Sequence, residues 1–329
     1  MCSHKVFVAM SLALSSCMSA AQTAPVLRLE REILLPNVEG RIDHLSADVR
    51  GQRVFVSALG NDSVEVVDFA HGQRVAQIKG LKEPQGVLYV PANQTLYVAN
   101  GEDGSVRSFD ARTMRPLKTV TLGDDADNLR FDAEHKLILV GYGSGAIATL
   151  TLDLAVKSEV KLPAHPESFQ LTPDGERLFV NLPRNRDVAV VDRGKQEVSA
   201  QWKNLAALAN FPMALDEEHQ RVFLACRMPA RLLVVDTHTG NVVAQRPTVG
   251  DADDLFYDRN RKSLYVIGGE GYLDVLHISD HNELASTGHV NTSAGARTGL
   301  FVPEWNRLFV AAPHRGSSPA RLLVYSLAP

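Results

Sequence analysis

Short apolar segments recur along the chain at a nearly constant spacing. One set of seven reads RVFVSAL, TLYVANG, KLILVGY, RLFVNLP, RVFLACR, SLYVIGG and RLFVAAP, beginning at residues 53, 95, 136, 177, 221, 263 and 307. Each member is preceded by a second apolar segment, such as NLRFD or DLFYD, and is followed by a third, such as SVEVVDF or RLLVVD. A weaker fourth, such as RVAQIKG, follows in most repeats. Because these segments are rich in Val, Leu, Tyr and Phe and are bounded by Gly, Pro, Asp and Asn, they predict β-strands.

The spacing of the segments predicts the architecture. Four antiparallel strands in a repeat of about 40–45 residues are typical of a β-propeller blade, and seven repeats predict an all-β, seven-bladed propeller. The last repeat stops after its third strand, at RLLVYSLAP. We therefore expect residues 29–35 (LEREILL) to supply the fourth strand of that blade, which closes the ring and removes an exposed sheet edge. No linker divides the repeats, so residues 22–329 are interpreted as one domain.

The repeat also carries a family resemblance. Residues 96–100 (LYVAN) resemble the consensus of the bacterial YVTN β-propeller repeat, and the other six members of the set are variants of it. The resemblance covers residues 28–327. With the phrases GRIDHL, DDADNL, AHPESFQ, NFPMALD, GDADDLFYD and PHRG, the chain looks like an exported subgroup of this WD40-like family with no assigned activity. The resemblance implies a fold and leaves function open, because propellers include enzymes, binding modules and scaffolds.

The first residues have the features of an export signal. An apolar run at 6–14 is followed by small residues, which predicts a signal peptide over residues 1–21 and a periplasmic protein. The alternative is a lipoprotein box at 14–17, in which Cys17 is acylated and the protein is anchored to the membrane. Cleavage after residue 21 leaves Cys226 as the one cysteine of the mature chain, so no internal disulfide can form.

Composition excludes some partners. The 329 residues are 45% hydrophobic and 22% charged, with a formal net charge of −4, which gives no basic footprint for nucleic acid. No C-x-x-C-H motif for covalent haem attachment is present. No sequence feature indicates permanent oligomerisation, and we expect a monomer.

Two copies of an acidic phrase raise the main functional question. DDADNLRFD begins at Asp124 and GDADDLFYD at Gly250, at equivalent places in the third and sixth repeats. Those blades would stand roughly 154° apart in a seven-bladed ring, so the phrases should nearly face each other across the channel mouth. Aspartates at the strand turns, such as Asp132 and Asp258, are instead expected to bond to their own backbone.

Aligning the repeats on their first strands places one residue of each leading loop, the loop that enters the first strand, at the channel. This inward register is Asp43, Gln85, Asp127, Glu167, Phe211, Asp253 and Thr298. Its neighbours include acids, histidines and arginines, among them Arg184, Arg186 and Arg227 from the same face. The predicted ligand-binding mouth is Arg41, Asp43, His44, Asp125, Asp127, Asn128, His165, Glu167, Asp251, Asp253, Asp254, Arg297, His314 and Arg315.

Three interpretations of this mouth stay open. The carboxylates could form a solvated rim neutralised by the arginines. Converging oxygens of Asp43, Asp127, Glu167 and Asp253 could hold a hard divalent cation such as Ca²⁺. Histidines 44, 165 and 314 would admit a transition metal instead.

The function favoured by the sequence is binding. We expect an exported binding or scaffold protein that uses the mouth for a small polar ligand, a cation or a partner protein. The resemblance also extends to sugar lactonases and haem-bearing propellers, which implies two alternatives: a metal-assisted, lactonase-like hydrolase or a component of a periplasmic redox system. In a hydrolase, Glu167 or Asp253 would act as base and His44 or His165 would carry protons. No catalytic residue is assigned, because no nucleophile–base pair is recognisable.

Overall fold

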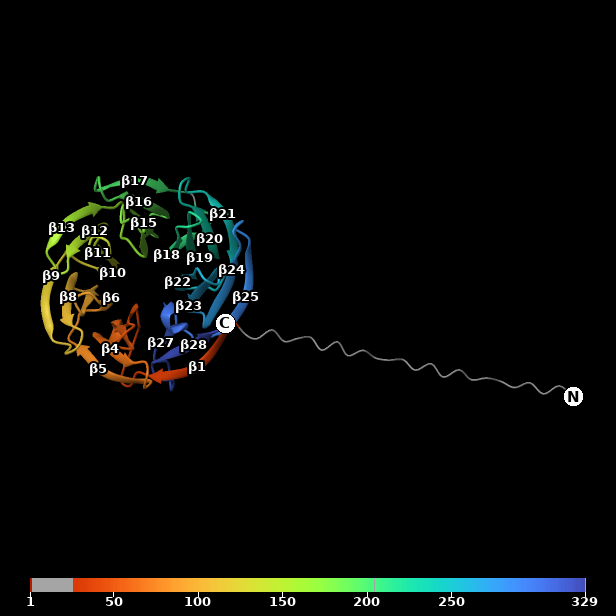
Figure 1. The fold of residues 1–329 in the computed structure, drawn as a ribbon, viewed down its shortest axis with the longest axis horizontal. Coiled ribbons are helices and arrows are strands. Elements are labelled where there is room, and N and C mark those ends of the chain that lie inside the picture. The colour runs from red at the N-terminus through yellow and green to blue at the C-terminus, as the bar shows by residue number, and fades with distance from the viewer. Residues whose placement is uncertain (2–25, 204, 329) are drawn as a thin grey trace.

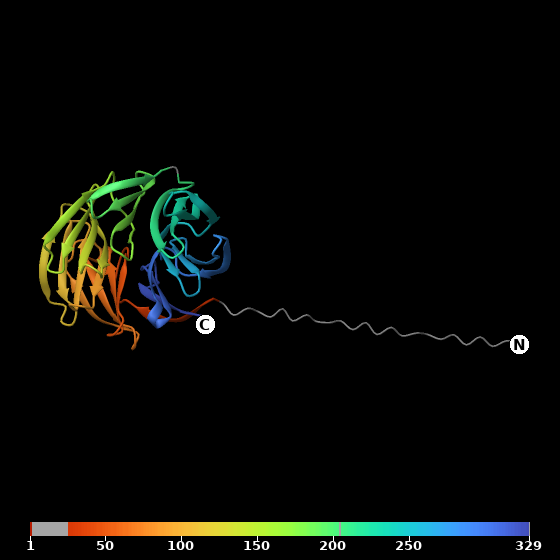
Figure 2. The ribbon, with the colours of Figure 1, turned by 45° about the horizontal axis from the view of Figure 1, so that its top comes forward.

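The computed structural model describes residues 1, 26–203 and 205–328. The predicted signal peptide and Cys17 lie outside the described residues, apart from Met1. Seven antiparallel sheets of four strands follow one another around a ring, as Figure 1 shows from red to blue and Figure 2 from an oblique side. The seven-bladed propeller expected from the repeats is therefore confirmed.

The strands follow the expected order within each blade. The first three blades contain β2 (Leu45–Asp48), β3 (Arg53–Ala58), β4 (Ser63–Asp68) and β5 (Gln73–Lys79); β6 (Pro84–Val90), β7 (Thr95–Asn100), β8 (Ser105–Asp110) and β9 (Pro116–Thr121); β10 (Ala126–Asp132), β11 (Leu137–Tyr142), β12 (Ala146–Thr151) and β13 (Val156–Lys161). The fourth and fifth contain β14 (Phe169–Leu171), β15 (Arg177–Leu182), β16 (Asp187–Asp192) and β17 (Glu197–Trp202); β18 (Leu208–Asp216), β19 (Arg221–Met228), β20 (Ala230–Asp236) and β21 (Val242–Pro247).

The sixth blade contains β22 (Ala252–Asp258), β23 (Ser263–Gly268), β24 (Tyr272–Ile278) and β25 (Leu284–Asn291), and the seventh contains β26 (Thr298–Val302), β27 (Arg307–Ala312), β28 (Arg321–Leu327) and β1 (Leu27–Leu34). The described residues also contain two short 3-10 turns, at Leu59–Asn61 and Pro303–Trp305. No helix of the described residues has the length and apolar character needed to cross a membrane.

The core lies between the blades. Second strands such as β7 and β23 are buried at every position, because a neighbouring blade covers each face of the sheet. This explains why their sequences are continuous apolar runs rather than alternating ones. Seven apolar clusters result, and each one joins two adjacent blades.

The turns between first and second strands are held by aspartate, as expected. Asp132 accepts hydrogen bonds from the backbone and ring of His135, at 3.0 Å each. Asp216 binds the buried Arg221 at 2.9 Å. These carboxylates are structural, since a turn aspartate that caps its own backbone stabilises the chain reversal.

The N-terminal strand closes the ring. β1 pairs antiparallel with β28, from Leu27 opposite Leu327 to Leu34 opposite Arg321. Ile33 is 1% exposed within the cluster that joins the seventh blade to the first, whereas its neighbour Leu34 is 53% exposed. The expected closing strand is therefore confirmed.

The burial of β1 gives a direct test of closure. Ile33→Ala should lower the free energy of unfolding by about 2–5 kcal/mol, because it leaves a cavity at the seam of the ring. The matched change Leu34→Ala should alter it by less than about 0.5 kcal/mol. Urea denaturation of both variants measures the difference. Equal stability of the two variants would mean that the strand does not hold the ring closed.

Candidate functional site

A polar cavity lies at the mouth of the central channel, on the face where the leading loops open. We call this cavity of about 130 Å³ the vestibule; it is lined by Arg41, Gln85, Asp125, Asp127, His165, Glu167, Arg184, Phe211, Arg227, Asp253 and Arg297. Seven of these were predicted mouth residues. Both acidic phrases contribute to the lining, through Asp127 and Asp253, so blades three and six do meet across the channel.

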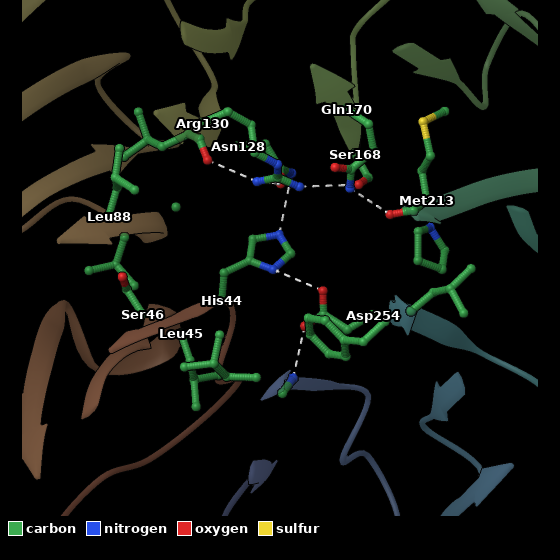
Figure 3. A pocket seen from close by; sticks show the side chains of 18 of the residues that line it. His44, Leu45, Ser46, Leu88, Asn128, Arg130, Ser168, Gln170, Met213 and Asp254 are labelled. Atoms are coloured by element: carbon green, nitrogen blue, oxygen red, sulfur yellow. Dashed lines mark hydrogen bonds and ion pairs between the residues drawn. The ribbon is translucent and has the colours of Figure 1, made fainter. Parts of the chain in front are cut away.

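Two further cavities lie next to the vestibule. A constriction of about 10 Å³ shares Asp127 and Glu167 with the vestibule. It shares His44, Asn128 and Ser168 with a larger chamber of about 270 Å³, whose other polar wall residues include Asp254, Arg130 and Gln170 (Figure 3). The predicted residues therefore divide between two compartments that meet at the constriction.

A backbone irregularity explains why consecutive side chains reach the channel. In the second, third, fifth and sixth blades the first strand has one residue more than its partner strand, as between Ala126 and Leu129 or between Ala252 and Asp254. Such a β-bulge breaks the strict alternation of a strand. Asp127 and Asn128 both line the constriction for this reason.

The four bulged blades also share a left-handed residue, which is Asp125 in the first phrase and Asp251 in the second. In the same four blades the residue two positions before the inward register has a left-handed backbone, with φ of 46° at Asp125 and 53° at Asp251. Aspartate tolerates this conformation better than most residues. The carboxylate of Asp125 also lines the vestibule: it accepts a hydrogen bond from the Gln85 amide at 2.9 Å and lies 3.5 Å from His165 Nδ1.

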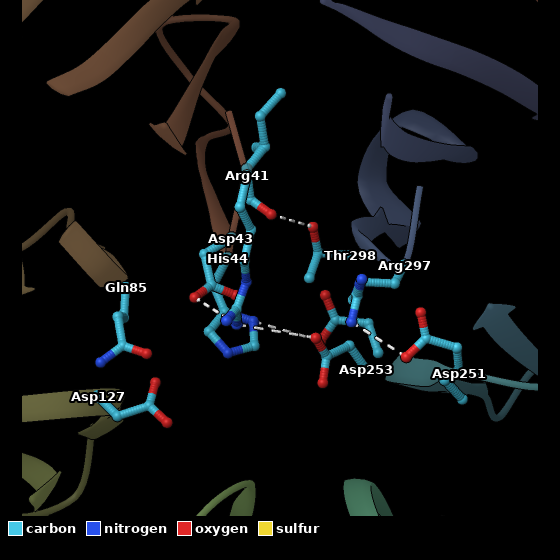
Figure 4. A network of polar contacts seen from close by, with 12 residues as sticks. Arg41, Asp43, His44, Gln85, Asp127, Asp251, Asp253, Arg297 and Thr298 are labelled. Atoms are coloured by element: carbon cyan, nitrogen blue, oxygen red, sulfur yellow. Dashed lines mark hydrogen bonds and ion pairs between the residues drawn. The ribbon is translucent and has the colours of Figure 1, made fainter. Parts of the chain in front are cut away.

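Arginines neutralise one side of the mouth. Arg227 binds Asp253 at 2.6 Å and Asp251 at 3.4 Å, and its guanidinium lies 3.8 Å from the centre of the Phe211 ring. Arg297 binds Asp251 at 3.0 Å (Figure 4).

Arg41 extends this network toward the first blade. It binds Asp43 at 3.0 Å and lies 3.9 Å from Asp253. Burial raises the pKa of Asp253 to about 7, although the Arg227 charge opposes the rise. On this side of the mouth, the carboxylates of Asp43, Asp251 and Asp253 are therefore already paired with arginines of the protein.

The opposite side of the vestibule is arranged differently. One oxygen each from Asp127 and Glu167 and a ring nitrogen of His165 all lie within 4.8 Å of one another. His165 Nδ1 is 2.6 Å from the carbonyl oxygen of Gly143, and Nε2 is 3.9 Å from Asp127. No hydrogen bond from any described residue reaches the carboxylates of Asp127 or Glu167, although Asp127 is 5% exposed.

Burial and like charge shift these groups. Burial, reinforced by the Asp127 charge, raises the pKa of Glu167 to about 8. Burial opposes protonation of His165, but Asp127 and the Gly143 carbonyl outweigh it and raise its pKa to about 9. For Asp127 the order is similar: burial opposes ionisation, while His165 and His44 hold its pKa below the usual range.

Polar groups of the chamber bind one another. His44 Nδ1 is 3.5 Å from Asp254, and His44 Nε2 is 3.3 Å from the amide of Asn128. Asp254 also accepts the backbone N–H of Gly299 at 2.8 Å. Burial disfavours the charged ring of His44, yet Asp254 and Asp43 raise its pKa to about 10. These three predicted ligand residues tie the first, third, sixth and seventh blades together.

The remaining predicted residues lie elsewhere. Asp251 supports the vestibule through Arg227 and Arg297 without lining it. His314 binds Glu39 at 2.7 Å, the Arg315 backbone pairs with Ser318, and neither residue lines the vestibule, constriction or chamber. The mouth therefore does not extend to the PHRG segment.

The structure groups the candidate metal ligands differently from the predicted set. Asp43 and Asp253 are bound by arginine, and the group gathered among the described residues is Asp127, His165 and Glu167. Sequence reasoning named all three but did not combine them. The sequence did contain the signal. In the repeat alignment Glu167 of the fourth repeat occupies the same position as Asp127 of the third, and His165 lies two residues before it.

The raised pKa of Asp253 has a measurable consequence. A carboxyl group whose pKa is about 7 when folded and 3.8 in its ordinary state binds more protons in the folded protein, so it reduces stability as pH rises from about 4 to 7. Asp253→Asn removes this effect. The free energy of unfolding of the variant, relative to the native protein, should increase by about 1–3 kcal/mol between pH 4.5 and 8, measured in urea with chelator present.

Asp236→Asn is a control of opposite sign. Hydrogen bonds from Thr239 lower the pKa of Asp236, so this carboxylate stabilises the fold above its ordinary pKa and loses that effect in acid. The free energy of unfolding of Asp236→Asn, relative to the native protein, should therefore decrease as pH rises from about 3 to 5. A flat difference for Asp253→Asn would show that its carboxyl group titrates normally, and a falling difference would show a lowered pKa; either result would contradict the raised pKa.

The chain is similar in sequence to proteins whose names state no activity. No protein-family model matches the chain. It is 31% identical over 97 residues to the uncharacterized protein YncE of Salmonella typhi, which covers 30% of the chain and 27% of that protein. It is 22% identical over 202 residues to YncE of Salmonella typhimurium strain LT2, which covers 59% of the chain and 56% of that protein. Both matches span less than two thirds of the relatives' length.

Solved structures share the fold at low identity. A chain of Kuenenia stuttgartiensis hydrazine synthase has a TM-score of 0.72 at 17% identity, covering 84% of this chain and 94% of that one. A chain in a crystal structure of the mitotic checkpoint complex has a TM-score of 0.78 at 15% identity, covering 99% of both. At these identities the likeness concerns the fold alone. The chain is thus a seven-bladed β-propeller with sequence homology to uncharacterized YncE-type proteins.

Proposed function

We propose that the chain is an exported binding protein of the YVTN-repeat type, whose vestibule takes a small polar ligand that carries a carboxylate and a hydrogen-bond donor or cationic group. One observation carries the proposal. Arg184 lines the vestibule and has no hydrogen bond or ion pair to the rest of the described chain, while Asp127 and Glu167 line the same cavity without a donor. An arginine without a protein partner, facing two carboxyl groups that accept no hydrogen bond from the described chain, is complementary to a ligand that carries both an acidic group and a hydrogen-bond donor.

The size of the vestibule favours a small occupant. A volume of about 130 Å³ is that of a few water molecules at roughly 30 Å³ each. It suits the polar end of a small molecule, such as an amino acid or a hydroxy acid. Phe211 and the Arg227 guanidinium packed on it provide a flat wall for the apolar part of such a ligand.

The surrounding ion pairs support binding by pre-organisation. Arg227, Arg297 and Arg41 are held by Asp253, Asp251 and Asp43. Side chains fixed in this way lose little conformational entropy when a ligand arrives. The same arrangement fits a binding or scaffold role for the propeller, and a segment of a partner protein is the other occupant that this mouth could take.

A second candidate is the metal-assisted hydrolase. The observation in its favour is the proximity of Asp127, His165 and Glu167, because a metal held by three protein groups with an open position can activate water or polarise a carbonyl. The redox alternative stays a prediction with no particular contact in its favour.

Arg184→Gln tests the binding proposal. A panel of amino acids, dicarboxylates and sugar acids is screened by thermal shift, and hits are measured by calorimetry with chelator present. At least one compound should bind, and Arg184→Gln should weaken it about 10- to 100-fold, because a hydrogen bond to a charged group contributes about 1.5–3 kcal/mol.

Arg186→Gln is the matched control. Arg186 lies in the same loop but lines a separate cavity with Lys203, Leu205 and Leu208, so this variant should bind as the native protein does. Equal affinity of the native and Arg184→Gln proteins would contradict the proposal. So would a folded protein that binds no member of the panel, in which case capture of a partner protein becomes the leading function.

A further inference from the structure

We infer that Asp127, His165 and Glu167 form a binding site for a divalent first-row transition metal ion, with an open position that faces the vestibule. The inference goes beyond the proposed ligand, because the three donors belong to the protein and an ion needs no ligand to bind them.

The donors come from two adjacent blades. Asp127 lies on β10 of the third blade, and His165 and Glu167 lie in the leading loop of β14 in the fourth. The loop is anchored next to the site, because the Glu167 N–H donates to the Asn181 carbonyl at 3.0 Å and Asn181 N–H donates to Ser168 at 3.0 Å. The donor atoms are therefore carried by fixed backbone.

The separations suit one ion. Zinc binds nitrogen and oxygen ligands at about 2.0–2.2 Å, so two ligands of the same ion lie at most about 4.3 Å apart. His165 Nε2 and Asp127 are 3.9 Å apart, which already meets this limit. All three donors lie within 4.8 Å of one another, so only small side-chain rotations are needed to close the site.

The orientation of His165 is an independent indication. Its Nδ1–H donates to the Gly143 carbonyl at 2.6 Å, which leaves Nε2 as the atom that faces Asp127. Metal-binding histidines usually donate their second nitrogen to a carbonyl or carboxylate in this way, which sets the ring orientation.

The Asp127 carboxylate gives a second indication. Its side chain is 6% exposed, and it lines both the vestibule and the constriction. A buried carboxylate normally accepts several hydrogen bonds. Among the described residues its nearest cationic group is His165 at 3.9 Å, beyond hydrogen-bond distance, so its oxygens remain available to an ion.

The donor set selects the class of metal. Calcium takes six to eight oxygen ligands, and the carboxylates that would complete such a shell, Asp43 and Asp253, are held by Arg41 and Arg227. One imidazole with two carboxylates suits Zn²⁺, Co²⁺ or Mn²⁺ instead. Three protein ligands leave at least one position for water or for a ligand carboxylate in the vestibule.

The test uses the full chain, purified without an affinity tag and stripped with chelator. Zn²⁺ alone is titrated by calorimetry, and Co²⁺ alone is followed by its visible absorption. We expect one equivalent of either ion, no comparable affinity for Ca²⁺, and a loss of at least about 100-fold in Zn²⁺ affinity in His165→Ala and Glu167→Gln, since even an outer-shell change costs 10–100-fold.

Matched controls lie on the same face. His314→Ala and Glu102→Gln remove an imidazole and a carboxylate that belong to ion pairs outside the vestibule, with Glu39 and Lys82 respectively, and should bind Zn²⁺ like the native chain. Glu167→Gln is the variant least expected to disturb folding, because no described residue bonds to the Glu167 side chain. Urea denaturation of each variant in chelator verifies this.

The outcomes separate this inference from the proposed function. Arg184→Gln should keep full Zn²⁺ affinity while it loses the small ligand. Absence of a Zn²⁺ or Co²⁺ equivalent in the folded native chain, or binding that survives in both His165→Ala and Glu167→Gln, would overturn the metal site. A preference for Ca²⁺ would also overturn the metal site. None of these results would affect the proposed function, because binding of the small ligand is measured with chelator present.

Discussion

The pairing of β1 with β28 is the contact on which the rest of the structure depends. A propeller blade buries its apolar second strand only when a neighbour covers each face, and every one of the seven apolar clusters joins two blades. Without β1, β28 would lose its outer partner strand, and the contact of the seventh blade with the first would be incomplete. Closure also sets the diameter of the channel, and with it the distances among the leading loops that form the mouth.

A closed ring forces polar side chains together at its axis. Each blade contributes a leading loop, and consecutive residues such as Asp43 with His44, Asp127 with Asn128 and Glu167 with Ser168 line the constriction. Carboxylates crowded in this way would repel one another and would be costly to desolvate. On one side of the mouth, Arg41, Arg227 and Arg297 compensate this negative charge. In the chamber, His44 pairs with Asp254.

The unequal compensation gives the mouth its chemical character. Where arginines occupy the carboxylates, the wall is a pre-formed structural network. Where Asp127, His165 and Glu167 meet, no arginine compensates the carboxyl groups, and burial together with the Asp127 charge disfavours ionisation of Glu167 and raises its pKa to about 8. A bound cation would favour the ionised carboxylates, and this is the physical link between the fold and both the proposed ligand site and the inferred metal site.

The sequence alone determined the number of blades, the closing strand and the residues that approach the channel, because these depend on strand periodicity and repeat length. The equivalent positions of Asp127 and Asp253 in blades three and six were enough to predict that the two residues lie on different sides of the mouth. The sequence could not show that His314 and Arg315 stand apart, that Asp43 and Asp253 are bound by arginine, or that His165 turns toward Asp127. Those outcomes depend on loop conformations, left-handed residues and side-chain contacts between blades. Such contacts join residues tens to hundreds of positions apart, so only the closed ring decides them.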